Sequence, residues 1–404
     1  MSTATTQPET TQPRVYVRRE GAITRITLNR PRALNALTSD MFALVKAGVA
    51  AAQTDGSQAI VLDGAGDRGF CGGGDIKQLS GPGSRDILAL EYSVDYAVAT
   101  SQVPVIGMMD GVTMGGGIGL AGHAHHRIVT ERSRLAMPEA RIGIVPDVGG
   151  HKLLARAPHH LGEYLALTAS EMTPADALAL DFADHLVPHA DLDALREALA
   201  AGEAPAAACA RFATVSVPRE EAISEFSVST NTGAITTVQP HALQAAPKLQ
   251  SAPLMVLAEW WGPLAAQALG ENWRAVFADP AAAALRIIAA LEAAAATDAD
   301  HAQAAAATAV TIKAMCPTSL AVTLAQIART RAFDFSLAEV LTDDLRVVGR
   351  LAVRPDFAEG ARAQVIDKDR NPIWQPATLE GLDAHDLAGI LDPALHADEP
   401  PLGL

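Results

Sequence analysis

The chain has 404 residues, of which 49% are hydrophobic and 19% are charged, and its formal net charge is −15. This composition is typical of a globular protein with a sizeable core and excludes a disordered chain. The acidic balance argues against nucleic acid as a partner, because no excess of Lys and Arg offsets repulsion from phosphates. The wide spacing of Cys71, Cys209 and Cys316 predicts neither a disulfide framework nor a zinc site.

The first 13 residues, MSTATTQPETTQP, are polar and contain no apolar segment. This segment lacks the apolar stretch that a signal peptide needs. We expect residues 1–13 to form a disordered tail. Farther along, we find no apolar run of the length that spans a bilayer. The sequence therefore predicts a cytoplasmic protein without a membrane partner.

The first half of the chain is predicted to alternate strands and helices. Val15–Asn29 predicts two strands joined by a turn at Glu20–Gly21. Ser39 to about Ala52 predicts an amphipathic helix capped at its start, and Ala59–Gly64 predicts a buried strand. A second helix is expected from about Ser84 to Thr100. This order predicts an α/β layered fold.

Two glycine-rich loops follow predicted strands, at Gly66–Asp75 (GDRGFCGGGD) and at Gly115–Gly117. Glycine allows the backbone to approach a ligand closely, so such loops can present bare amides to a developing negative charge. Neither loop fits the motifs that bind dinucleotides or nucleoside triphosphates. The loops predict amide donors without implying a nucleotide.

Two carboxylates, Glu139 and Asp147, follow the second glycine loop and are separated by the apolar run Ile142–Pro146. That run is too apolar to leave both acids on an ordinary solvated face. Two simpler interpretations are a surface glutamate at Glu139 and a helix cap at Asp147, before a helix near Gly149. Donors upstream and two acids downstream favour an active site.

Other chemically suggestive residues are interpreted as structural. The pair His125 and His126 has no third ligand at metal spacing, which predicts surface histidines. Cys71 has no histidine positioned as its base, so we expect a small core residue. Trp260–Trp261 is more typical of packing than of stacking on a ligand. No metal is therefore predicted.

The stretches GFCGGGD, MGGGIGL and MPEARIGIVPDVGG resemble, in order and spacing, the crotonase (enoyl-CoA hydratase/isomerase) superfamily. Within it, the sequence is most similar to the 3-hydroxyisobutyryl-CoA hydrolase branch. Glu139 is paired with Asp147, where hydratases usually carry glycine at the second position. Gly119 stands where hydratases place their first catalytic glutamate. Asp356–Pro376, preceded by Cys316–Leu320, also looks like the C-terminal region of that branch.

The resemblance covers Val15–His189 and Met315–Leu382 and implies a ββα spiral core followed by an α-helical C-terminal region. We expect the core with its CoA-binding and catalytic loops at 14–200, a divergent helical and loop insertion at 201–310, and helices covering the acyl pocket at 311–404. Residues 217–273 depart from the family pattern. They are compatible with a lid, an oligomer contact or an extra loop over the site.

The resemblance also implies roles for individual residues. The backbone amides of Gly72 and Gly116 would form an oxyanion hole for a thioester carbonyl. Glu139 would be the acid/base or nucleophilic carboxylate, while Asp147 would hold a 3-hydroxyl or position water. Glu91 would complete the polar pocket, although an isolated helix glutamate is as often solvated. The other residues expected to bind the CoA substrate are Arg32, Ala33, Leu34, Gly73, Gly74, Asp75, Ile76 and Gly115.

The resemblance implies hydrolysis of a short 3-hydroxyacyl-CoA thioester, of the 3-hydroxyisobutyryl-CoA type found in valine degradation. Hydration of a double bond needs two carboxylates around one water, and Gly119 removes one of them. For hydrolysis, Glu139 is compatible with activating water or with attacking to form an anhydride.

The alternatives are an enoyl-CoA hydratase/isomerase acting on a short or branched acyl-CoA and a non-catalytic acyl-CoA-binding protein. The expected partners are an acyl-CoA and, from the family's habit, further copies of the chain in a dimer or trimer. No cofactor beyond the CoA of the substrate is expected.

Overall fold

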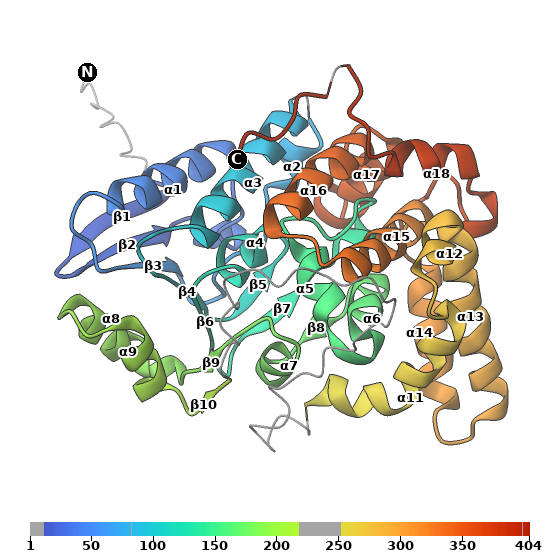
Figure 1. Cartoon of the computed structure of the whole chain (residues 1–404), viewed down its shortest axis with the longest axis horizontal. Helices are drawn as coiled ribbons and strands as arrows, with labels where there is room; N and C mark the ends of the chain where they lie inside the picture. Colours follow the sequence, from blue (N-terminus) through green and yellow to red (C-terminus); the bar gives the residue numbers. More distant parts are fainter. Residues whose placement is uncertain (1–11, 82, 218–251, 398) are drawn as a thin grey trace, which may run out of the picture.

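The computed structural model describes residues 12–81, 83–217, 252–397 and 399–404 (Figure 1). Two expectations lie mainly outside these residues, namely the N-terminal tail and the middle of the insertion at 217–273. An α/β half, drawn blue to green, is followed by a helical half, drawn yellow to red, as the resemblance predicted (Figure 1).

The larger sheet has seven strands in the order β1-β2-β3-β4-β6-β9-β10. The two outer pairs, β1 with β2 and β9 with β10, are antiparallel, and the pairings between them are parallel. The strands are β1 (Val15–Glu20), β2 (Ile23–Leu28), β3 (Ala59–Gly64), β4 (Val105–Met109), β6 (His126–Val129), β9 (His185–Leu186) and β10 (Val215–Ser216).

A smaller sheet has the order β5-β7-β8, formed by β5 (Val112–Met114), β7 (Arg134–Ala136) and β8 (Glu171–Met172). Strands β4 and β5 follow each other in the chain but belong to different sheets. The chain therefore passes repeatedly from the larger sheet to the smaller one, which places the β5–α4 glycine loop beside the loop after β3.

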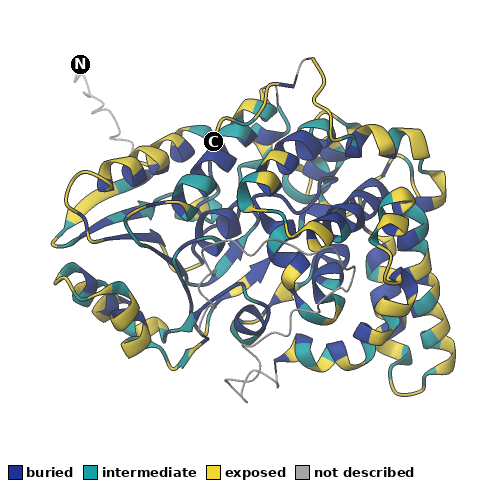
Figure 2. Cartoon of the chain, viewed as in Figure 1, coloured by how far each residue is buried: buried dark blue, intermediate teal, exposed yellow. Residues whose placement is uncertain are grey.

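Helices of the first half cover both faces of the larger sheet. They are α1 (Ser39–Ala52), α2 (Ile76–Leu79), α3 (Ser84–Ala99), α4 (Gly116–Gly122), α5 (Gly150–Arg156), α6 (Leu161–Thr168), α7 (Pro174–Ala179), α8 (Leu192–Ala200) and α9 (Pro205–Phe212). Strand alternation separates two cores: Val105 and Met109 join the main core, whereas Ile106 and Met108 face α8 and α9. Figure 2 shows the central strands and helices as largely buried.

The described residues that follow position 252 form helices joined by loops, and none of them is in a strand. Its helices are α11 (Pro253–Leu269), α12 (Trp273–Ala278), α13 (Pro280–Thr297), α14 (Ala302–Lys313), α15 (Pro317–Phe333), α16 (Leu337–Leu351), α17 (Pro355–Ala361) and α18 (Ala384–Leu391). Trp261 is buried and its indole N–H donates to the carbonyl of His160, which confirms its packing role.

Helix α16 begins at Leu337, directly after its N-cap residue Ser336. Ser336 and Glu339 form a capping box that satisfies the first backbone amides of this helix. One further expectation needs correction: α13 is long and apolar enough, by length and composition, to cross a membrane. In this fold α13 packs against α11, α14 and α15, and about one third of it is buried.

Candidate active site

The two glycine loops predicted from the sequence lie against each other. A Cβ on Gly73 would lie 3.6 Å from the amide nitrogen of Gly116, and a Cβ on Gly116 would lie 3.3 Å from the amide nitrogen of Gly74. The φ angles of Gly73 (+97°) and Gly115 (+48°) are positive, which favours glycine at both turns. The close approach depends on the missing side chains.

The predicted role of Gly72 as an amide donor is wrong in this structure. Its N–H already donates to the carbonyl of Leu34 across 2.7 Å, so it is not available to a ligand. Within the described residues, the amides of Gly74 and Gly116 have no hydrogen-bond acceptor. Gly116 is the first residue of α4, where amides have no intrahelical partner. Gly74 and Gly116 are therefore the two candidate donors.

Glu139 begins a short 3-10 turn after β7 and is 4% exposed, so it is not a surface glutamate. Its Oε1 lies 3.0 Å from the position of a Cβ on Gly115. Its Oε2 is buried and has no hydrogen-bond partner in the described residues. Burial, and then the negative charge of Asp147, raise the pKa of Glu139 well above its usual value.

Asp147 is also buried, and its Oδ2 accepts a hydrogen bond of 2.7 Å from the hydroxyl of Tyr92 on α3. Its side chain does not cap α5, whose N-cap residue is Gly149. Burial and then the charge of Asp344 raise the pKa of Asp147 to about 7, against the lowering effect of Tyr92. The next residue, Val148, has a φ of +53°, a strained value for a β-branched residue.

Glu91 is 2% exposed, so the solvated interpretation is wrong and the predicted place in a polar pocket is compatible with the fold. It lies on α3, and a Cβ on Gly116 would collide with its Oε1. Its Oε2 lies 3.7 Å from the position of a Cβ on Gly74. Burial, followed by the charge of Asp147, raises the pKa of Glu91 well above its usual value. Glu91 thus lies beside both candidate amides.

Asp95, one helical turn after Glu91, is a buried acid that sequence reasoning missed. It is fully buried, and neither carboxyl oxygen has a hydrogen-bond partner among the described residues. The two oxygens lie 2.8 and 2.9 Å from the position of a Cβ on Gly119. Its carboxyl group therefore fills the space that opens at Gly119, where hydratases carry their first catalytic glutamate.

Asp344 is a further acid of this cluster and His151 is its neighbour. Neither residue was identified from the sequence. Asp344 lies on α16 and accepts the N–H of Gly149 across 2.9 Å. Its Oδ1 lies 3.0 Å from Nε2 of His151, and Nδ1 of that ring is 2.9 Å from Oγ1 of Thr330. Both side chains are fully buried. The C-terminal helices thus contribute directly to the surroundings of Asp147.

The remaining predicted residues line the outer side of the first glycine loop. Arg32 and Ala33 form a short 3-10 turn that ends at Leu34 in a left-handed conformation, and Arg32 is exposed. Asp75 caps α2, which starts at Ile76, and forms a 2.6 Å ion pair with Arg30. The Asp75 carboxylate is thus already engaged within the protein. CoA contacts of these residues remain predictions.

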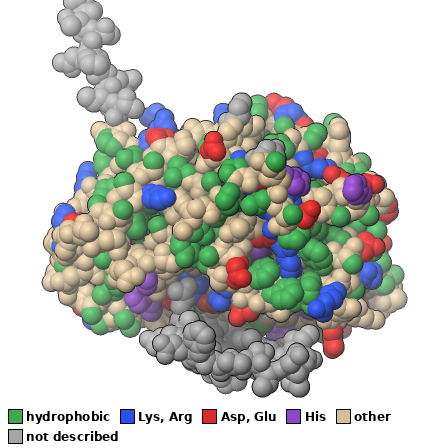
Figure 3. Space-filling view, turned by 45° about the horizontal axis from the view of Figure 1, so that its top comes forward, with side chains coloured by type: hydrophobic (Ala, Val, Ile, Leu, Met, Phe, Trp, Pro, Cys, Tyr) green, Lys and Arg blue, Asp and Glu red, His purple; other side chains and the backbone are tan. Residues whose placement is uncertain are grey.

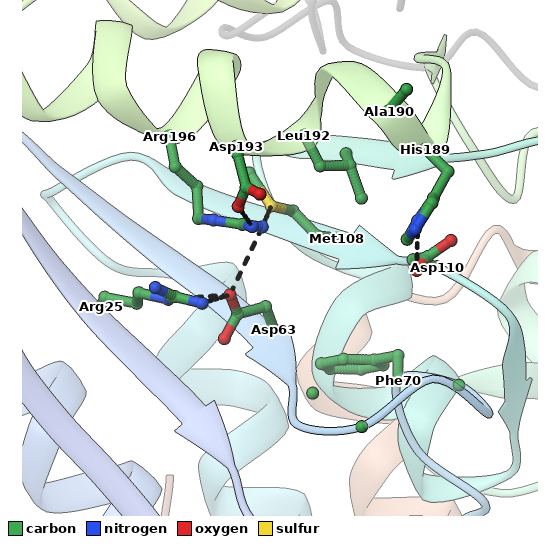
Figure 4. Close-up of a pocket in the computed structure, with 13 residues that line it drawn as sticks. Arg25, Asp63, Phe70, Met108, Asp110, His189, Ala190, Leu192, Asp193 and Arg196 are labelled. Atoms are coloured by element: carbon green, nitrogen blue, oxygen red, sulfur yellow. Dashed lines mark hydrogen bonds and ion pairs between the residues drawn. The ribbon is translucent and has the colours of Figure 1, made fainter.

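A cavity of about 220 Å³ lies elsewhere, between α8 and strands β2 to β4 (Figure 4). Arg25 and Arg196 converge on Asp63 there, at 2.8 and 3.6 Å, and His189 pairs with Asp110 at 2.9 Å. None of its lining residues belongs to the predicted site.

On the face drawn in Figure 3, Lys and Arg side chains of the described residues are interspersed with Asp and Glu.

Comparison with known proteins identifies the family. The family model described as enoyl-CoA hydratase/isomerase matches residues 23–251 and 264–391. A relative from Xenopus tropicalis named "3-hydroxyisobutyryl-CoA hydrolase, mitochondrial" is 31% identical over 362 residues, 88% of this chain and 82% of the relative.

Two solved structures are similar over nearly the whole chain. A carnitinyl-CoA dehydratase from Mycobacterium thermoresistibile has a TM-score of 0.76 and 32% identity, covering 97% of this chain and 99% of that one. An enoyl-CoA hydratase from Rhodobacter sphaeroides 2.4.1 has a TM-score of 0.70 and 33% identity, covering 94% and 98%. The chain therefore belongs to the enoyl-CoA hydratase/isomerase family, the crotonase superfamily, and is an enzyme with the crotonase fold.

Proposed function

We propose that the protein hydrolyses a short 3-hydroxyacyl-CoA thioester, with 3-hydroxyisobutyryl-CoA as the first candidate. The observation that carries the proposal is the position of the buried Glu139 carboxyl beside the glycine loops that hold the free amides of Gly74 and Gly116. The name of the Xenopus tropicalis relative supports the choice of substrate. A role in valine degradation follows from that substrate.

In this proposal, the thioester oxygen accepts hydrogen bonds from the amides of Gly74 and Gly116. Negative charge grows on that oxygen in the transition state, so fixed donors there lower the barrier. One such donor contributes about 2.7–4 kcal/mol. Glu91, whose carboxyl lies beside both amides, must be neutral or displaced when the carbonyl binds, because a charged Glu91 would repel the developing oxyanion.

Glu139 supplies the reacting carboxylate. As a base, it takes a proton from water while the hydroxide adds to the thioester carbon. The tetrahedral intermediate then expels the CoA sulfur, which takes the proton from Glu139. As a nucleophile, Glu139 would instead form an anhydride that water opens. Both routes need ionised Glu139, and its raised pKa makes it a stronger base and keeps the proton available for the leaving sulfur.

The test is free-thiol release with 3-hydroxyisobutyryl-CoA and, in parallel, hydration of crotonyl-CoA. The proposal expects rapid thiol release from the hydroxyacyl substrate and its loss in Glu139→Ala and Asp147→Ala. Consumption of crotonyl-CoA without thiol release would assign the protein to the hydratases. A variant that keeps its melting temperature but loses thiol release separates chemistry from folding.

The second candidate function is hydration or dehydration of an enoyl-CoA. It is favoured by the names of the two similar solved structures and by Asp95, whose carboxyl group occupies the space beside Gly119. A carboxyl group there would restore a second acid to the site. The crotonyl-CoA arm tests this function, and Asp95→Asn should abolish hydration while sparing thiol release.

A further inference from the structure

His126, His185 and Cys209 form a cluster that the proposed reaction does not use. Their candidate ligand atoms all lie within 4.8 Å of one another, the one such group of three among the described residues. His126 begins β6, His185 begins β9 and Cys209 lies on α9. The sequence offers His126 no third ligand at metal spacing, whereas the fold brings two candidate partners from distant segments to this half-buried residue.

Sheet register explains why the two histidines meet. Ile128 is paired with His185 across β6 and β9, and His126 lies two residues before Ile128. Residues two apart on a strand share a face, so both imidazoles project from the same face as diagonal neighbours. Their ring centroids are 5.9 Å apart. This is the face that α8 and α9 cover, where Ile128 and Cys209 belong to the smaller hydrophobic core.

Cys209 is fully buried, whereas both histidines are half-buried. Nδ1 of His185 lies 2.9 Å from the Ser216 hydroxyl, a contact that orients the ring and leaves Nε2 to face a ligand. A second hydrogen bond of this kind accompanies most metal-binding histidines. Burial lowers the pKa of His185, which keeps its ring neutral. Asp184, the residue before His185, is paired with Arg127, so its charge is compensated within the protein.

The chemistry of the set selects the ion. Two imidazoles and one thiolate suit zinc and similar divalent transition metals, and do not suit magnesium or calcium, which take oxygen ligands. Zinc bonds of about 2.0–2.3 Å place tetrahedral ligand atoms roughly 3–4 Å apart, so small side-chain rotations close the present spacing. Burial raises the pKa of Cys209 to about 12, so coordination must displace the thiol proton to solvent.

We propose that His126, His185 and Cys209 bind one divalent transition-metal ion, with zinc as the expected occupant and water as the fourth ligand. The ion would link α9 and the β9–β10 pair to the first residue of β6. This site lies on the sheet face opposite the main core, so it is separate from the proposed active site and its test does not depend on the proposed reaction.

The experiment uses the full chain without a polyhistidine tag, stripped with a chelator and then titrated with Co²⁺ and with Zn²⁺. We expect one Co²⁺ per chain, a sulfur-to-cobalt charge-transfer band and the intensified visible bands of tetrahedral cobalt. Zn²⁺ should displace Co²⁺ and raise the melting temperature, because a ligand that binds only the folded state stabilises it. Ser216→Ala should weaken binding by roughly 10–100-fold.

Cys209→Ser and His126→Ala should each lose the charge-transfer band. Because His126 is only half-buried, we expect His126→Ala to fold, so its loss of the band would not reflect unfolding. Cys316→Ser is the matched control, since Cys316 is also a buried free cysteine but lies beside Asp356, away from the cluster. Cobalt binding without the sulfur band, a band that survives in Cys209→Ser, or no binding by the intact chain would each overturn the proposal.

Discussion

The hydroxyl of Tyr92 donates a hydrogen bond to Oδ2 of Asp147 across 2.7 Å, and both side chains are buried. This contact joins α3 to the loop before α5, and it gives Asp147 a hydrogen-bond donor among several buried acids. The charge of Asp147 raises the pKa of Glu91 and of Asp95, and the charge of Asp344 raises the pKa of Asp147. The protonation of Asp147 therefore depends on α3, on its own loop and on the C-terminal helix α16.

Tyr92→Phe removes the donor and leaves the ring in place. Because a hydrogen bond to a charged group contributes roughly 1.5–3 kcal/mol, we expect kcat/KM to fall about tenfold or more. The Tyr92 bond lowers the pKa of Asp147, so its loss should also move the acid limb of the rate profile to higher pH. Tyr96→Phe, one turn farther along α3, is the control. An unchanged limb in Tyr92→Phe would contradict this coupling.

The pH dependence of activity should report the acid cluster. Burial and the charge of Asp344 raise the pKa of Asp147 to about 7, and the proposed reaction needs Asp147 and Glu139 ionised while Glu91 is neutral or displaced. We therefore expect kcat/KM to rise with pH and to be half-maximal near pH 7. Asp344→Asn removes one negative charge, so its limb should shift to lower pH. A profile that is flat from roughly pH 5 to pH 9 would count against the assignment.

Gly116→Ala tests the pair of amide donors. The added methyl group would collide with Oε1 of Glu91 and lie 3.3 Å from the amide of Gly74. We expect kcat to fall by roughly 10²–10³-fold, the cost of losing one oxyanion donor. Gly389→Ala on α18, where a Cβ meets nothing within 4 Å, is the matched control and should keep full activity. Equal rates for both variants would disprove the role of this loop.

Asp95→Asn should change the free energy of unfolding and its dependence on pH. Burial, and then the charge of Glu91, raise the pKa of Asp95 well above its usual value of 3.8. The folded state therefore keeps a proton that the unfolded chain releases above about pH 4. This contribution is fully present at lower pH and is lost as pH rises through the folded pKa. Asparagine cannot ionise, so its benefit should grow with pH.

We expect Asp95→Asn to stabilise the fold at pH 8 by about 1–3 kcal/mol relative to the wild type, with a smaller difference at low pH. Urea unfolding at several pH values measures this difference. A stability gain that is independent of pH would show that Asp95 is not the group that titrates.

The local elements could be predicted because their signals are local. Alternation and turn residues predicted β1 and β2, and a capped amphipathic pattern predicted the helix Ser39–Ala52. The start of α16 carries a signal of the same local kind, because Ser336 and Glu339 form a capping box. The two glycine loops and Glu139 were found because their types and order are unusual.

The partners of the site could not be predicted in the same way. Asp344 reaches Gly149 only because α16 packs on α3 and α5, which sequence periodicity does not encode. The N–H of Gly72 likewise is unavailable to a ligand only because it donates to the carbonyl of Leu34, a contact that the sequence does not reveal. One signal was available for Asp95: it follows Glu91 by four residues, which puts both on one face of α3, as the spacing of three puts Gly116 and Gly119 on one face of α4.

The central claim is that Glu139 drives thioester hydrolysis, and the most direct measurement is CoA release from 3-hydroxyisobutyryl-CoA by the wild type and by Glu139→Gln. Glutamine keeps the shape of the side chain and removes its basicity. We predict rapid release by the wild type and a loss of roughly 10²–10⁴-fold in kcat for the variant, with an unchanged melting temperature. Undiminished release by Glu139→Gln, or none by the wild type, would contradict the account.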